Sequence, residues 1–178
     1  MNDLELVTRA ADFAARRHVG QRRKGHAAEP YINHLAEVAS LIAEATEGKD
    51  AALVAAGWLH DTLEDTDTER EELVTLFGED VTALVAAATD DKSLPKAERK
   101  RLQIAHAPGL APRAKVLKIA DKISNLRSLI LSPPDGWERE RLIDYVDWAD
   151  KVVAGCRGVN PRLDRLFDDT VAEARDVL

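Results

Sequence analysis

Hydrophobic residues recur at helical spacing along almost the whole chain, whereas the alternation typical of half-buried strands is nearly absent. In the first segment, for example, Leu4, Val7, Ala11 and Ala14 lie on one stripe of a helix. The same spacing predicts helices over residues 3–18, 31–46, 50–62, 79–89, 95–106, 112–131, 138–155 and 161–177.

Polar and turn-forming residues mark where these helices begin and end. A further helix is expected before Gly78, with Thr66–Thr68 offering N-caps and acidic residues in its first turn. Pro133–Gly136 reads as a turn, and Asn160 followed by Pro161 is typical of a helix start. The pattern predicts an all-α protein, a compact single domain of about eight to ten helices.

Composition agrees with a globular helical protein. The 178 residues are 45% hydrophobic, 32% charged and only 4% aromatic, a mixture rich in helix-forming residues. The single cysteine, Cys156, excludes an internal disulfide, and no window approaches the roughly 20 apolar residues of a membrane-spanning helix. The N-terminal stretch is acidic where a signal peptide is basic, so we expect a cytoplasmic protein.

The net charge of −7 argues against general binding to nucleic acids or anionic membranes. The charge is nevertheless uneven, because two basic islands, residues 13–28 and 109–127, contain almost no acid. Such islands on an acidic protein favour a local anion site. The alternative, that they are solvated helix faces, stays open on sequence alone.

A set of histidines and acids carries the candidate chemistry. His34 lies early in one predicted helix, the pair His60-Asp61 closes another, and Asp121 interrupts an apolar and basic helix. A lone carboxylate among apolar residues is costly unless it is paired or bound to a metal. Imidazole and carboxylate together suit a borderline divalent cation. Each residue alone has an ordinary structural explanation, such as a hydrogen-bonded core histidine or a solvated helix end.

Several motifs, in order, resemble a known family. His34, His60-Asp61 and Asp121 resemble the metal-binding pattern of the HD-domain phosphohydrolases. More narrowly, the chain is similar to the hydrolase domain of the RelA/SpoT family, and most of all to its stand-alone small alarmone hydrolases of the metazoan SpoT homologue type. The motifs that carry this resemblance are FAARRH, QRRKG, YINH, LHDTLEDTD, FGEDV, TDDKSLPKAERKR, KIADKISNLR and DGW…YVDWA.

The resemblance implies an HD-type domain over residues 1–178, with its metal and catalytic core in about 13–130 and helices 138–177 completing the pocket. It implies one Mn²⁺, with Zn²⁺ or Fe²⁺ as alternatives, held by His34, His60, Asp61 and Asp121. It also implies two catalytic acids, Glu64 and Asp65, for which an acidic helix end is the structural alternative. The substrate-binding residues that it implies are Arg23, Lys24, Lys96, Asn125, Arg141 and Tyr145.

The expected activity is hydrolysis of (p)ppGpp to GDP or GTP plus pyrophosphate by metal-activated water. Two alternatives remain: a phosphatase for another 3′- or 2′-phosphorylated nucleotide such as NADPH, and a non-catalytic alarmone-binding module. We expect a small nucleotide partner, with no nucleic acid and no membrane, and the sequence does not distinguish a monomer from a homodimer.

The sequence departs from the family pattern at Leu35, which stands where the family has proline and is expected to loosen that turn. Lys118 and Lys122 flank Asp121 and are expected either to supply positive potential or simply to lie on the surface. No functional role is expected for the remaining histidines or for the tryptophans, which we interpret as packing residues: His18, His26, His106, Trp58, Trp137 and Trp148.

Overall fold

The computed structural model describes residues 1–178, and the predicted all-α class is confirmed. The chain contains α-helices and one short 3₁₀ helix, with two isolated bridges and no strand. The helices belong to two compact units, one of residues 1–21 and 31–94 and the other of residues 22–30 and 95–178. None of the helices is long and apolar enough to cross a membrane.

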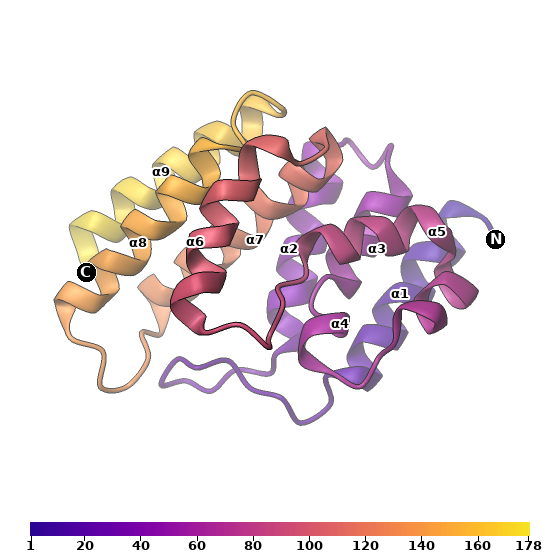
Figure 1. Ribbon diagram of the computed structural model, residues 1–178, viewed down its shortest axis with the longest axis horizontal. Helices are drawn as coiled ribbons and strands as arrows, with labels where there is room; N and C mark the ends of the chain where they lie inside the picture. Colours follow the sequence, from indigo (N-terminus) through magenta and orange to yellow (C-terminus); the bar gives the residue numbers. More distant parts are fainter. The chain divides into compact units, whose positions relative to one another are not determined.

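The first unit is built around α3 (Ala51–Leu59), which contacts α1 (Asp3–Arg17), α2 (Ile32–Ala45) and α5 (Arg70–Ala88) (Figure 1). The sequence of α3, AALVAAGWL, is apolar on all sides, as expected for a helix covered by neighbours all round. The alanines and the glycine of α3 allow these three neighbouring helices to approach it closely. This central helix leads directly into the His60-Asp61 pair.

Gly57 sets the distance between α3 and α2. A Cβ at this position would lie 2.9 Å from Ile42 Cδ1 and 3.1 Å from Ala39 Cα. Leu35, which replaces the family's proline, is fully buried in the same helix α2, so it joins the core there. The two helices that carry His34 and lead to His60 are therefore held together by close packing.

The prediction of one helix over residues 50–62 was wrong at its C-terminal end. α3 ends at Leu59, and a separate short helix, α4 (Thr62–Asp65), follows. Side chains take over the last carbonyls of α3: Thr62 Oγ1 donates to Leu59 O at 2.6 Å, and His60 Nδ1 lies 2.8 Å from Gly57 O. These local bonds turn the chain at Asp61.

α5 contains the predicted break at Gly78, where φ is +84°. This left-handed conformation is accessible to glycine at little cost, so the helix changes direction there. The expected cap at Thr66–Thr68 was wrong, because α5 begins at Arg70 after Glu69. The Thr66 hydroxyl instead accepts the backbone N–H of Thr68 at 3.1 Å, which stabilises the preceding turn.

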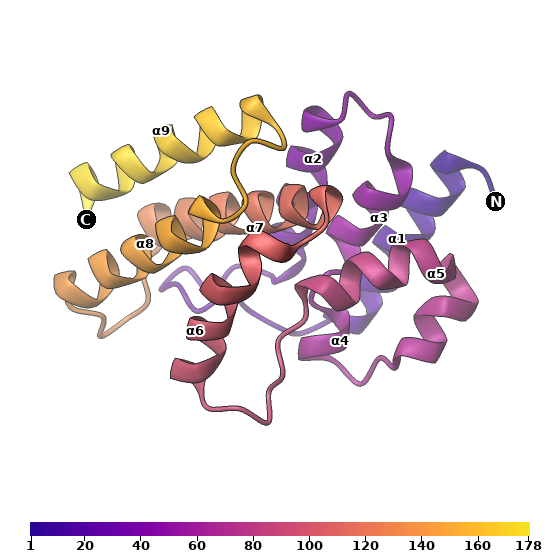
Figure 2. The ribbon, with the colours of Figure 1, turned by 45° about the horizontal axis from the view of Figure 1, so that its top comes forward.

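In the second unit, α7 (Pro112–Leu131) contacts both α8 (Arg139–Ala154) and α9 (Pro161–Val177) (Figure 2). α6 (Lys96–His106) packs against α8 and is followed by the 3₁₀ helix Ala107–Gly109. The predicted cap of α9 is confirmed, since Asn160 Oδ1 accepts from Leu163 N at 3.0 Å.

The segment 22–30 is fastened to the turn that follows α7. Ala27 N donates to Ser132 Oγ at 2.9 Å, and His26 N donates to Pro133 O at 3.2 Å. Gly25 approaches this turn so closely that a Cβ would lie 2.1 Å from Ser132 O, so only glycine fits. This contact orders the segment that carries Arg23 and Lys24.

Candidate functional site

Two buried imidazoles face each other in the first unit. His34, in the first turn of α2, and His60, after the end of α3, have their Nε2 atoms 3.2 Å apart. Because the Gly57 carbonyl can only accept, His60 donates to it through Nδ1, and this leaves a lone pair on Nε2. The tautomer that exposes Nε2 as a ligand is thus set by the helix end itself.

Asp61 directs a carboxylate at both imidazoles. Its Oδ2 lies 3.2 Å from His60 Nε2 and 3.6 Å from His34 Nε2, and Tyr31 Oη donates to the same oxygen at 2.7 Å. Burial acts to raise the pKa of Asp61, but the two imidazoles outweigh it and hold the pKa well below its usual range. Asp61 is therefore present as a carboxylate.

This donor set fits a single divalent cation. Two ligand nitrogens about 2.1 Å from one ion lie roughly 3.0–3.4 Å apart at octahedral or tetrahedral angles. The 3.2 Å between His34 Nε2 and His60 Nε2 falls in that interval. The candidate metal ligands of the chain are His34 and His60 in the first unit and Asp121 in the second. The contacts of Asp61 with both imidazoles make it a further candidate from the first unit.

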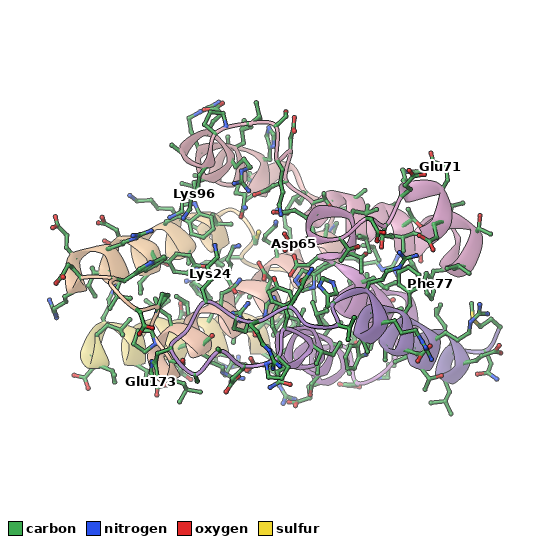
Figure 3. The ribbon with its side chains drawn as sticks, turned by 90° about the horizontal axis from the view of Figure 1, so that it is seen from below. Lys24, Asp65, Glu71, Phe77, Lys96 and Glu173 are labelled. Atoms are coloured by element: carbon green, nitrogen blue, oxygen red, sulfur yellow. The ribbon has the colours of Figure 1, made fainter.

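The two predicted catalytic acids lie on α4, directly after these ligands. Burial raises the pKa of the Glu64 carboxyl, and the charges of neighbouring carboxylates add to this, while a backbone bond from Asp90 N at 3.0 Å opposes it. Asp65, labelled in Figure 3, forms an ion pair with Lys92. The two neighbouring acids therefore have different environments, which is the arrangement expected when they have different roles.

In the second unit, Asp121 has both carboxylate oxygens engaged. Asn125 Nδ2 donates to Oδ1 at 2.7 Å, and Lys122 Nζ donates to Oδ2 at 2.9 Å. Arg23 Nη2 in turn donates to Asn125 Oδ1 at 2.9 Å. The structure thus brings three of the predicted site residues, Arg23, Asn125 and Asp121, into one hydrogen-bonded chain.

The suggested surface position of Lys118 and Lys122 was wrong, because these residues are 7% and 4% exposed. The Lys122 ammonium also lies 4.6 Å from the centre of the Trp148 ring. A buried lysine is costly unless it is paired, and here the Asp121 carboxylate and the aromatic face supply the pairing. Sequence patterns missed this role of Trp148, which was interpreted only as a packing residue.

Residues of α6, α7, α8 and the turn before α8 form a cation–aromatic cluster, composed of Lys96, Lys100, Lys122, Arg141, Trp137, Tyr145 and Trp148. Arg141 lies 4.1 Å from the Trp137 ring centre, and Lys96 lies 5.9 Å from it. Burial lowers the pKa of Lys96, and the nearby charges of Lys24 and Arg141 lower it further. Lys24 and Lys96 are labelled in Figure 3.

The cation–aromatic cluster brings the positive charges of Lys96, Lys100 and Arg141 against aromatic rings, so its chemistry suits an anion rich in phosphate. At the start of the first basic island, residues 13–28, the arginines are instead paired with acids. Arg16 pairs with Asp12 at 2.9 Å, and Arg17 pairs with Asp67 at 2.9 Å, so these two arginines serve the surface of the first unit. The solvated-face interpretation thus holds for part of that island.

Comparisons with known proteins find relatives over most of the chain. A family model described as "HD domain" matches residues 10–144. The guanosine-3′,5′-bis(diphosphate) 3′-pyrophosphohydrolase MESH1 of Xenopus tropicalis is 46% identical over 172 residues, covering 94% of this chain and 96% of the relative. The MESH1 protein of Homo sapiens is 48% identical over 155 residues and covers 87% of each chain.

A solved structure, described as a metazoan orthologue of SpoT that hydrolyses ppGpp, superimposes with a TM-score of 0.91 at 42% identity, covering 97% of each chain. Another, from Listeria monocytogenes, has a TM-score of 0.67 at 30% identity and covers 84% of this chain and 96% of that one. The family match and these relatives extend over both units of the structure. The chain therefore belongs to the HD domain family and, within it, to the MESH1 type.

Proposed function

We propose that this protein is a guanosine-3′,5′-bis(diphosphate) 3′-pyrophosphohydrolase that depends on a divalent metal. Water attacks the phosphorus joined to the 3′ oxygen, the phosphorus–oxygen bond breaks, and the 3′ oxygen takes a proton. The products are pyrophosphate and GDP, or GTP from the pentaphosphate. The observation that carries this proposal is the pair of facing imidazoles, His34 and His60, with the Asp61 carboxylate on both.

Four side chains are proposed to hold the metal: His34, His60 and Asp61 from the first unit and Asp121 from the second. The family resemblance favours Mn²⁺, and imidazole nitrogen and carboxylate oxygen donors without thiolate also suit Zn²⁺ or Fe²⁺. When bound, such an ion would lower the pKa of a coordinated water toward neutrality, to about 7 in favourable zinc sites.

Glu64 and Asp65 are proposed to act on the attacking water and the departing oxygen. Burial raises the pKa of Glu64 above its ordinary value, which suits a carboxylate that takes a proton from water and later returns it. Asp65, paired with Lys92, keeps a charge partner and is suited to orienting the water. A positioned acid–base group contributes on the order of 10²–10⁴ in rate.

The second unit is proposed to bind the nucleotide. Arg23 and Lys24 would flank the base, and Asn125 would contact the base or the sugar. In the bound state the Arg23–Asn125 bond therefore has to open or to be shared with the substrate. The distal phosphates suit Lys96, Arg141 and Tyr145, since guanidinium and ammonium groups form charge-assisted bonds with phosphate oxygens.

We propose further that both units belong to one HD-type hydrolase domain over residues 1–178. The family model ends at residue 144, but the Xenopus relative aligns with 94% of the chain. α8 carries Arg141 and Tyr145, and its Trp148 contacts Lys122 beside Asp121. These contacts support a role for the C-terminal helices in the binding pocket.

Product analysis tests this function. Purified protein is incubated with ppGpp and Mn²⁺, with and without a chelator, and pyrophosphate and orthophosphate are measured separately, with NADPH as a parallel substrate. We expect equal amounts of pyrophosphate and GDP, abolished by the chelator. Orthophosphate as the only product, from either substrate, would support a phosphatase instead. Binding of ppGpp without turnover in Mn²⁺ would indicate a non-catalytic module.

A further inference from the structure

Tyr31 contacts the Asp61 carboxylate at the oxygen that faces the imidazoles. Its hydroxyl donates to Asp61 Oδ2 at 2.7 Å, and the same oxygen lies 3.2 Å from His60 Nε2. A carboxylate on a short side chain can rotate, and a donor fixed at one oxygen restricts that rotation. The hydroxyl thus determines which oxygen points toward His34 and His60.

Tyr31 is itself held on three sides. Its backbone N–H donates to Gln21 O at 3.0 Å, which joins the two ends of the segment 22–30. Its ring stacks on His18, with centroids 5.3 Å apart and an interplanar angle of 20°. The His34 ring meets it edge-on at 5.6 Å. A hydroxyl on so constrained a ring has little freedom, so it can orient a neighbouring group.

Gln21 extends the same arrangement to Asp65. Its Nε2 donates to the Asp65 carbonyl at 2.8 Å, and its Oε1 lies 2.8 Å from His18 Nδ1. Because a backbone carbonyl only accepts, the amide nitrogen must face Asp65 and the amide oxygen must face His18. His18 therefore donates through Nδ1. The backbone carbonyl of Asp65 thus fixes the direction of both hydrogen bonds, the one from Gln21 to Asp65 and the one from His18 to Gln21.

From these contacts we infer that Tyr31 and Gln21 are positioning residues, Tyr31 for the carboxylate of Asp61 and Gln21 for the backbone of Asp65, with His18 supporting both. This inference rests on the proposed function, in which Asp61 is a metal ligand and Asp65 a catalytic acid. His18, which was expected to have no functional role, is 2% exposed and becomes the support between the two positioning residues.

Tyr31→Phe isolates the hydroxyl, because phenylalanine retains the ring and its stacking on His18. Loss of a partner behind a metal ligand typically weakens metal affinity about 10- to 100-fold. We expect the Mn²⁺ dissociation constant of the metal-stripped variant to rise by that factor, while kcat at saturating Mn²⁺ stays close to that of the unmodified protein. Isothermal titration with Mn²⁺ alone, without nucleotide, measures the affinity.

Tyr145→Phe is the matched control, since it removes the other tyrosine hydroxyl of the chain, in the second unit. Its Mn²⁺ affinity is expected to equal that of the unmodified protein. Gln21→Met keeps the side-chain length but loses both amide contacts. We expect unchanged Mn²⁺ affinity in Gln21→Met and a kcat reduced by about tenfold or more, the effect typical of lost outer-shell partners.

Helical circular dichroism and thermal unfolding confirm that each variant is folded. If Gln21→Met does not fold, Tyr31→Phe still decides the inference for Asp61. An Mn²⁺ dissociation constant for Tyr31→Phe within about twofold of the unmodified protein, well below the usual outer-shell effect, would overturn it. Failure of the proposed function can be told apart from failure of this inference. If the unmodified protein binds Mn²⁺ but does not hydrolyse ppGpp, the proposed function fails, while the Mn²⁺ dissociation constants of the unmodified protein and Tyr31→Phe can still be compared.

Discussion

Replacing Lys122 by methionine tests the buried ion pair on α7. Lys122 Nζ lies 2.9 Å from Asp121 Oδ2, and the two side chains are 5% and 15% exposed. Methionine keeps the unbranched apolar stem but removes the ammonium, so the carboxylate loses one partner. The bond from Asn125 to the other oxygen, at 2.7 Å, remains.

The expected loss follows from these contacts. A hydrogen bond to a charged group contributes about 1.5–3 kcal/mol, and removing one partner of a buried pair costs about 3–5 kcal/mol. Because Asn125 still bonds Asp121, the lower range applies. Loss of the cation from the Trp148 face, 4.6 Å away, adds about 0.5–1 kcal/mol. We therefore expect the free energy of unfolding of the metal-free protein to fall by about 2–4 kcal/mol.

A double-mutant cycle in urea separates the pair from general packing. Four metal-free proteins are unfolded: unmodified, Lys122→Met, Asp121→Asn, and the double variant. In the Asp121→Asn background no carboxylate is left unpaired, so Lys122→Met should cost about 1.5–3 kcal/mol less than in the unmodified protein. A coupling energy below about 0.5 kcal/mol would refute the reasoning, since it would mean that the two charges do not stabilise each other.

Three other changes probe the site and its support. Glu64→Gln should retain Mn²⁺ affinity but lower kcat by about 10²–10⁴-fold, and an unchanged kcat would remove Glu64 from the mechanism. Burial and nearby positive charges lower the pKa of Lys96 from its ordinary 10.5, so its ammonium loses its proton at a lower pH than that of a free lysine. KM for ppGpp should therefore rise with pH in the alkaline range, before pH 10.5 is reached. Lys96→Met should have a high KM without this climb, and a climb of the same size would contradict the assignment. Gly57→Ala should lower the free energy of unfolding by about 1–2 kcal/mol, because overpacking against Ala39 exceeds the gain in helix propensity. Denaturation in urea measures this, and equal or greater stability would show that the helices can separate freely.

The helices that carry strong local signals were predictable from the sequence. α7 was predicted over residues 112–131 and is found at Pro112–Leu131, because proline at its first position and unbroken apolar spacing define it locally. α9 begins as predicted at Pro161, after the Asn160 cap. Such signals lie within a few residues of the boundary that they determine, so they can be read without knowledge of the fold.

Boundaries that depend on competing side-chain bonds were not predictable. The helix was predicted to continue to residue 62, but the bonds from His60 and Thr62 to the last carbonyls end α3 at Leu59. At the start of α5, Thr66 had the residue type of an N-cap, yet its hydroxyl is used within the preceding turn. In both places the same polar groups had two local partners, and propensity alone does not choose between them.

The candidate metal ligands of the first unit, His34 and His60, could be singled out from the sequence because imidazoles near helix termini, one of them next to a carboxylate, are typical of a metal site. The supporting contacts could not. The bond from Tyr31 to Asp61 joins residues 30 positions apart, and that from Gln21 to Asp65 joins residues 44 apart. Lys122 follows Asp121 directly, but its burial against Trp148 depends on how α8 packs on α7. These contacts arise from tertiary structure, and no local pattern indicates them.

The most direct test of the account is pyrophosphate release from ppGpp as Mn²⁺ is added back to metal-stripped protein. We expect no release before addition, a rise with bound Mn²⁺, and saturation at one ion per chain. Full activity of the stripped protein, or no pyrophosphate at any Mn²⁺ concentration, would contradict it.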